Sequence, residues 1–250
     1  MLSISPRRLT KFLSFVVLGL LGASLVSQFF TAIYGCETGF ICSLAKFVNV
    51  DREKNLPSLY STLTLVLCAL LLAMIALQKR AEGDRDRHHW TGLAGIFLFL
   101  GMDEALSFHE KIDKLIKGVV NTTGIFHYAW LLPALAGVVI VLGFYQPFWQ
   151  RLPQQSRRLV LAALATFLSG AVGMEMLAGL YVSYAQQWNR LLWAMMTLIE
   201  EGLEMAGVLI LIYALLSYMA NYAQEVRIRV GDRPALALDA APASPYTNSR

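Results

Sequence analysis

Residues 192–218 read LWAMMTLIEEGLEMAGVLILIYALLSY, an apolar run that holds three glutamates and no lysine or arginine. The run is long enough to cross the hydrocarbon core of a bilayer as a helix, which takes about 20 residues. A charged side chain inside such a span is costly and rare, so an acid at this depth is usually functional. This stretch therefore predicts a membrane-spanning helix with a functional site inside it.

Five further apolar segments have similar lengths. The six predicted spans are 12–34, 58–78, 90–108, 128–147, 159–184 and 192–218. Because backbone groups in lipid must be satisfied within the segment, each span is expected to be a helix. Only 15% of the 250 residues are charged, against about 25% in a typical soluble domain. We expect an all-α polytopic membrane protein: a bundle of six transmembrane helices in one domain, residues 1–222, with a flexible cytoplasmic tail, residues 223–250.

The lysines and arginines predict how this bundle is oriented, because cytoplasmic loops carry the excess of positive charge. The side with both termini holds fourteen of them: Arg7, Arg8, Lys11, Lys79, Arg80, Arg85, Arg87, Arg151, Arg157, Arg158, Arg227, Arg229, Arg233 and Arg250. The other side holds seven: Lys46, Arg52, Lys54, Lys111, Lys114, Lys117 and Arg190. We expect both termini in the cytoplasm and the protein in a bacterial inner membrane.

Six acids fall inside the predicted spans, where no lysine or arginine accompanies them: Asp103, Glu104, Glu175, Glu200, Glu201 and Glu204. A helix rises about 1.5 Å per residue, which puts the acids of three different spans at overlapping depths in the outer half of the bundle. Random placement would not tend to produce this overlap. The sequence therefore predicts one carboxylate site rather than six unrelated acids.

Histidines near these acids favour a metal site, because carboxylates and imidazoles on facing helices bind Mn, Fe or Zn. Glu200 and Glu204 share a helix face, and Asp103 and Glu110, seven residues apart, also share one. We expect Glu201 to act as a general base. His109 is about as well explained as a plain interfacial histidine, and the acids could instead hold protons. The predicted ligands of a divalent transition metal are Asp103, Glu104, His109, Glu110, Glu175, Glu200 and Glu204.

Two local features complete the predicted outer side. The stretch 111–120 places Ile112, Leu115, Ile116 and Val119 on one helical face, and is expected to prolong the third helix along the membrane interface. Cys36 and Cys42 share one outer loop, where a disulfide and two unrelated small residues are equally good interpretations.

The run 100–110, LGMDEALSFHE, resembles a motif of uncharacterised bacterial multi-pass membrane proteins, in which Asp-Glu-Ala is followed by His-Glu. The later run 200–205, EEGLEM, is similar to a second motif of the same group. The resemblance covers the third to sixth spans. It implies a shared site but brings no activity.

Three functions fit these patterns. A metal-binding membrane protein ranks first, and a metal-dependent membrane enzyme and a cation- or proton-coupled transporter are closely ranked elaborations of it. A structural or assembly subunit of a membrane complex is the remaining alternative. The expected partners are membrane lipid and a small cation or lipid-phase substrate. No nucleotide-binding or nucleophile-elbow motif is present, and nothing indicates nucleic-acid binding. The sequence does not predict an oligomeric state.

Overall fold

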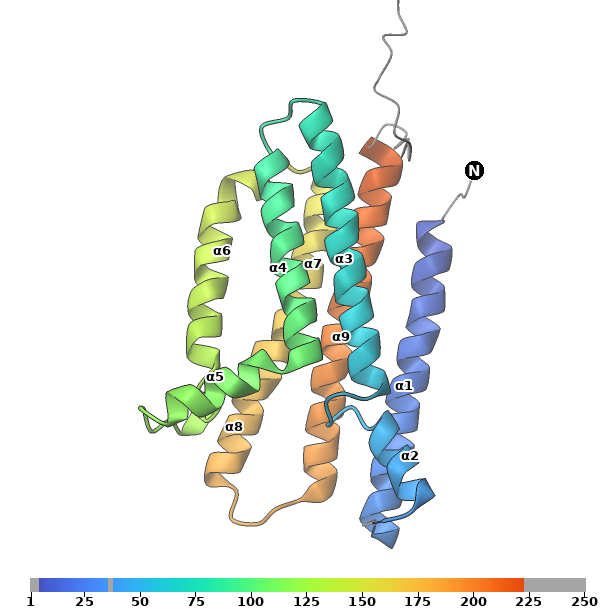
Figure 1. Ribbon diagram of the computed structural model, residues 1–250, viewed down its shortest axis with the longest axis vertical. Coiled ribbons are helices and arrows are strands. Elements are labelled where there is room, and N and C mark those ends of the chain that lie inside the picture. The colour runs from blue at the N-terminus through green and yellow to red at the C-terminus, as the bar shows by residue number, and fades with distance from the viewer. Residues whose placement is uncertain (1–4, 36–37, 223–250) are drawn as a thin grey trace, which may run out of the picture.

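A computed structural model of the chain describes residues 5–35 and 38–222, and all of its regular elements in these ranges are helices (Figure 1). The predicted tail, residues 223–250, lies outside the described residues. Short elements are α2 (Phe40–Val48), α5 (Phe108–Lys117) and the 3-10 turn η1 (Gly124–Phe126). The long helices are α1 (Pro6–Tyr34), α3 (Leu56–Ala81), α4 (Arg87–Leu106), α6 (Leu131–Arg151), the run α7 (Gln154–Leu168), η2 (Ser169–Met174) and α8 (Glu175–Tyr184), and α9 (Arg190–Tyr222).

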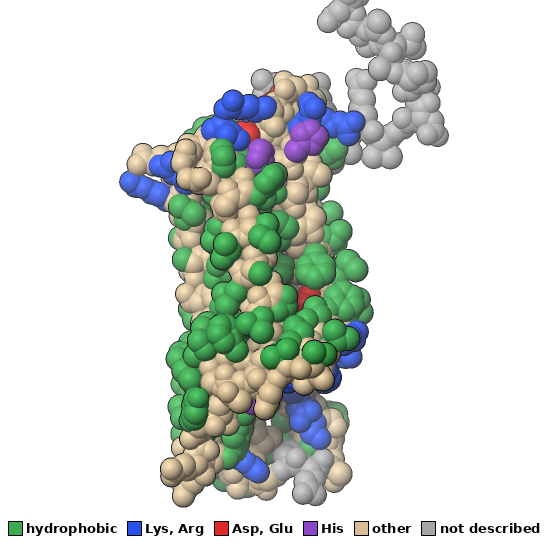
Figure 2. All heavy atoms as spheres, turned by 90° about the vertical axis from the view of Figure 1, so that its left-hand side faces the viewer, with side chains coloured by type: hydrophobic (Ala, Val, Ile, Leu, Met, Phe, Trp, Pro, Cys, Tyr) green, Lys and Arg blue, Asp and Glu red, His purple; other side chains and the backbone are tan. Residues whose placement is uncertain are grey.

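Within the described ranges, five helices are long and apolar enough to cross a membrane, or six if the bent pair α4 and α5 counts as one span. Each predicted span overlaps one of them. We call the end where α1 begins and α9 ends the tail end, and the opposite end, with α2 and α5, the α5 end (Figure 1). On the face shown in Figure 2, Lys and Arg side chains lie toward both ends and hydrophobic side chains cover the middle.

The third span differs from its prediction. Helix α4 ends at Leu106, and Ser107 adopts a left-handed conformation with φ 53° and ψ 50°. The chain then turns by 76° into α5. A continuous helix through residue 108, prolonged to residue 120, was therefore the wrong expectation, because a left-handed residue interrupts the helical hydrogen-bond ladder. Its predicted apolar face survives only in part, since α5 ends at Lys117 and leaves Val119 outside the helix.

The tail-end half of the bundle is filled by apolar side chains. This core cluster joins α3, α4, α6, α7 and α9, and its largest members are fully or almost fully buried: Leu72, Ile75, Trp90, Phe148, Ile212 and Leu215. Such close packing leaves no room for water between the helices. The acids are consequently confined to the α5 half of the bundle.

Helix α6 joins this bundle mainly at its tail end. There Tyr145 and Phe148 pack their rings against His89 and Trp90 of α4. Farther along α6 the side chains of Val139 and Ile140 are 68% and 69% exposed. These two side chains in the middle of α6 thus do not pack against the neighbouring helices.

Two of the three cysteines lie within the described residues. Cys68 is free and buried in the tail-end core, and Cys42, in α2, is disulfide-bonded. Cys36, the other half of the predicted pairing, lies outside the described residues.

Candidate functional site

The bend between α4 and α5 brings a carboxylate and an imidazole together. Asp103, in the last turn of α4, accepts hydrogen bonds from the backbone N–H of His109 at 2.8 Å and pairs with its Nδ1 at 3.0 Å. The other ring nitrogen, Nε2, lies 3.4 Å from Oε1 of Glu53, which comes from the loop before α3. The hydroxyl of Ser107 donates to the other oxygen of Glu53. His109 therefore stands between two carboxylates, one on each ring nitrogen.

Charge around His109 favours its protonated form. Burial alone would lower the pKa of the imidazole, but the hydrogen bond and negative charge of Asp103, with Glu53 and Glu175, outweigh it and raise that pKa to about 9. Helix α5 is turned away from α4 and is not itself one of the spans. The pKa of the Glu53 carboxyl group is also raised, by burial and by the nearby charge of Glu110. For a carboxyl group this shift favours the neutral form.

A second group of carboxyl groups lies deeper in the bundle. Glu104 is close to the Ser58 hydroxyl at the start of α3 and interacts electrostatically with Glu53 and His109. Glu201 and Glu204, on α9, each interact with Glu104 and Glu175. All of these deeper acids are half-buried. Acids of α4, α8 and α9 are therefore near enough to one another to interact electrostatically.

Trp130 connects the bend to the deeper acids. Its ring centroid lies 5.4 Å from that of His109, and its indole Nε1 donates to Oε1 of Glu175 at 3.1 Å. Glu175 is in turn within side-chain hydrogen-bonding reach of Glu200. An ionised carboxylate only accepts hydrogen bonds, so a bond between these two groups needs one proton. The site is therefore a continuous chain of polar side chains from Glu53 to Glu200.

The π-helix η2 sets the position of Glu175. Such wide helical turns are rare and are frequent at functional sites. Gly170, within η2, lies directly against the turn of α9 that carries Glu200 and Glu204, since a Cβ atom there would be 2.6 Å from the carbonyl oxygen of Glu200 and 2.9 Å from Cγ of Glu204. The missing side chain lets α9 approach η2, and Glu175 follows immediately at the start of α8.

The structure separates one predicted ligand from the rest. Glu110 is on the exposed side of α5, where its carboxylate pairs with Lys114 at 3.4 Å. The face that Asp103 and Glu110 were expected to share does not exist, because the helix breaks between them at Ser107. The predicted acids and histidine that do come together are Asp103, Glu104, His109, Glu175, Glu200, Glu201 and Glu204.

The acids and the histidine that come together do not form a complete set of metal ligands in the described residues. In the part of the chain that the structure describes, no three His, Cys, Asp or Glu side chains are grouped so that they could hold a metal ion. The nearest arrangement is the pair of His109 Nε2 and Glu53 Oε1, with Glu104 interacting electrostatically with both residues. These are the groups best placed to act on a cation.

Sequence reasoning missed three parts of the site. Glu53 reaches His109 from a loop, and Ser107 faces Glu53 only because of the bend; neither carries a recognisable signal. The third is η2, for which the sequence SGAVGM offers one: Gly170 and Gly173 lie in a span immediately before an acid. Glycines are poor helix formers, so their pairing at this point indicates an irregular turn.

Comparison with known proteins assigns the chain to a family, but the description of that family gives no activity. A family model described as Domain of unknown function (DUF8692) matches residues 10–219, which include all the acids of the site. No curated protein and no solved structure matches the chain.

Proposed function

We propose that this chain, which belongs to the DUF8692 family of domains of unknown function, is an integral membrane protein that binds a divalent cation at the α5 end of its bundle. We further propose that the bound cation serves an enzymatic reaction at the membrane surface. The α5 end would face away from the cytoplasm, because most lysines and arginines lie at the tail end or beyond it.

The observation that carries the proposal is the orientation of His109. Metal-bound histidines almost always donate their second ring N–H to a carboxylate, which fixes the tautomer and the ring. Asp103 is in this position on Nδ1, and Nε2 lies next to Glu53, where a bound cation would displace the proton that the carboxylates favour on the free imidazole. Two ligands bound about 2.1 Å from one tetrahedral ion lie roughly 3.4 Å apart. The distance between Nε2 and Oε1 of Glu53 is also 3.4 Å.

The remaining acids suit accessory roles. Glu104 is the proposed third ligand because it interacts with both His109 and Glu53. Glu201 is the proposed general base, because it interacts electrostatically with Glu104, Glu175 and His109. A bound Mn, Fe or Zn ion would supply Lewis acidity and an activated water at this position.

Access supports an enzyme over a transporter. A transporter must open its site to each side of the membrane in turn, whereas an enzyme needs one opening. The apolar cluster around Ile75, Phe148 and Ile212 fills the tail-end half, and the polar chain begins at the loop carrying Glu53.

A second candidate function is proton-coupled transport, and one contact favours it. Glu175 and Glu200 lie within hydrogen-bonding reach, which needs a shared proton. Protonatable acids inside a membrane are a common feature of proton relays. In this alternative His109 would pass protons between Glu53 and the deeper acids.

Metal content tests the first proposal. The parent protein, His109→Ala and His88→Ala would be purified in detergent from cells supplied with Mn, Fe and Zn, and their metals measured by plasma mass spectrometry. His88 is an exposed histidine at the tail end, so its variant also lacks one imidazole but leaves the site intact.

We expect a stoichiometric metal in the parent and in His88→Ala, and its loss from His109→Ala. A parent protein without metal would overturn the proposal. Proton uptake by vesicles containing the parent, abolished in Glu200→Gln, would then support the alternative.

A further inference from the structure

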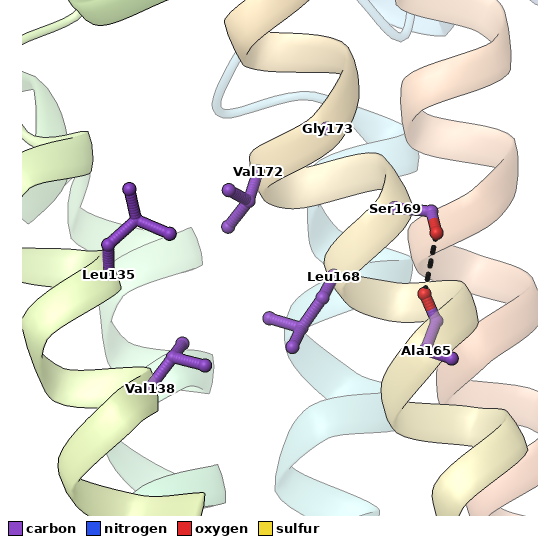
Figure 3. A pocket seen from close by; sticks show the side chains of 7 residues that line it. All are labelled: Leu135, Val138, Ala165, Leu168, Ser169, Val172 and Gly173. Atoms are coloured by element: carbon purple, nitrogen blue, oxygen red, sulfur yellow. Dashed lines mark hydrogen bonds between the residues drawn. The ribbon is translucent and has the colours of Figure 1, made fainter.

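A groove runs between α6 and the junction of α7 with η2. Leu135 and Val138 of α6 point into it from one side, and Leu168 and Val172 from the other (Figure 3). Its volume is ≈ 300 Å³. Ser169 supplies the only polar side chain among the lining residues, and its hydroxyl donates to the carbonyl of Ala165 at 2.7 Å. The groove is therefore lined mainly by hydrocarbon.

The two walls of the groove are joined by a hydrogen bond of the polar site. Trp130 precedes α6 and donates to Glu175, which follows η2, so this hydrogen bond connects the two walls. Leu135 and Val138 lie four and seven residues into α6, which is roughly 6–10 Å from its first turn at 1.5 Å per residue. Trp130 and Glu175 do not line the groove, but they lie on the same two walls, toward the α5 end of its lining residues.

The helices that form the groove also carry exposed apolar side chains close to it in sequence. Val139 and Ile140, next to Val138 on α6, are 68% and 69% exposed. Leu161, on α7, and Leu177, on α8, are also exposed. In a bilayer these side chains would be in contact with acyl chains, and a groove between the same helices would take up one of them.

We propose that the groove holds one acyl chain of a membrane lipid, and that lipid of this kind is the substrate class of the site at the α5 end. The substrate part of this inference rests on the proposed function. A chain in the groove would bring its polar headgroup to Trp130, Glu175 and His109. The hydrocarbon walls would bind the acyl chain whatever its headgroup. Selection of the headgroup would depend on Trp130, Glu175 and His109.

Crosslinking tests the occupant. The full-length protein would be placed in vesicles of phosphatidylethanolamine and phosphatidylglycerol that contain a phosphatidylglycerol with a diazirine in one acyl chain. After illumination, the labelled residues would be located by peptide mass spectrometry. We expect label on Leu135, Val138, Leu168 and Val172 above the level on exposed apolar residues.

Two neighbouring valines provide a matched pair of variants. Val138→Trp fills the groove, whereas Val139→Trp adds the same bulk on the exposed face of α6. We expect a several-fold loss of groove label in Val138→Trp and parental label in Val139→Trp. Thermal unfolding would show whether Val138→Trp is folded. Leu168→Trp fills the groove from its other wall and provides a second test if Val138→Trp is misfolded.

Equal labelling in Val138→Trp and Val139→Trp would overturn the inference, and so would label spread evenly over the exposed faces. An unlabelled groove in the parent protein, with self-association of the parent that Val138→Trp abolishes, would overturn the inference and assign the groove to a second copy of the chain. Metal content is measured on the same samples. A labelled groove in a protein without metal would leave lipid binding standing while the proposed enzyme fails.

Discussion

Asp103 holds His109 by two atoms at once, its Oδ1 accepting from the backbone N–H at 2.8 Å and its Oδ2 pairing with the ring Nδ1 at 3.0 Å. One carboxylate therefore satisfies a backbone donor exposed by the start of α5 and also orients the imidazole. The bend between α4 and α5 and the geometry of the site depend on the same side chain. A variant that keeps one acceptor oxygen but removes the charge can therefore distinguish the role of Asp103 in the bend from the effect of its charge on His109.

Asp103→Asn tests the contribution of the charge. The variant keeps an oxygen that can accept from the backbone N–H of His109, but removes the negative charge beside Nδ1. If His109 is a metal ligand, losing such a supporting carboxylate should cost about 10–100-fold in metal affinity. Competition with a chelating dye would measure it. Glu82→Gln is the control, because Glu82 is an exposed carboxylate that pairs with Lys79 at the tail end, far from His109. Equal affinity in both variants would contradict the role assigned to Asp103.

The ion pairs of His109 should make stability depend on pH. Its folded-state pKa, about 9, is above the ordinary histidine value of about 6.5. The stabilisation is therefore fully present below about pH 6.5 and is lost as the pH rises through about 9. With a chelator present, the melting temperature of the parent should fall more between pH 7 and pH 10 than that of His109→Gln. Parallel curves for the two proteins would show that the imidazolium does not stabilise the fold.

The long helices could be predicted from sequence because apolar length alone decides them. Each predicted span overlaps a long helix, since a run of hydrophobic residues has no other stable backbone conformation in lipid. The clustering of the acids could also be predicted, because helix rise converts sequence position into depth. These two arguments use only local geometry.

The parts that could not be predicted depend on contacts between distant residues. Ser107 ends α4 in a left-handed conformation that Asp103 supports from four residues earlier and Glu53 from another loop. Assigning Asp103 and Glu110 to one face assumed a helix that continues past residue 107. Glu53 enters the site from a loop, and loop paths are not encoded in periodicity.

Glu200→Gln tests the carboxyl pair. Glu175 and Glu200 lie within hydrogen-bonding reach, so two negative charges there would repel each other unless one carries a proton. The amide of Gln keeps the shape and supplies a donor without a proton from solvent. We expect the variant to melt at the same temperature as the parent or higher near neutral pH, as measured by tryptophan fluorescence in detergent. Glu110→Gln, at an exposed position, should leave the melting temperature unchanged. A marked loss of stability in Glu200→Gln alone would mean that Glu200 is needed as a charged group, as a cation ligand would be.

Gly170→Ala tests whether close approach of η2 to α9 builds the deeper half of the site. The added Cβ would lie 2.6 Å from the Glu200 carbonyl oxygen, which cannot move without shifting α9. Overpacking of this kind costs about 1–3 kcal/mol, so we expect a lower melting temperature. Gly137→Ala is the matched control, since a Cβ atom at that position in α6 meets nothing within 4 Å. Its better helix propensity predicts a change between zero and about 1 kcal/mol of stabilisation. If both alanines shift the melting temperature alike, the contact between Gly170 and the turn at Glu200 does not position the acids.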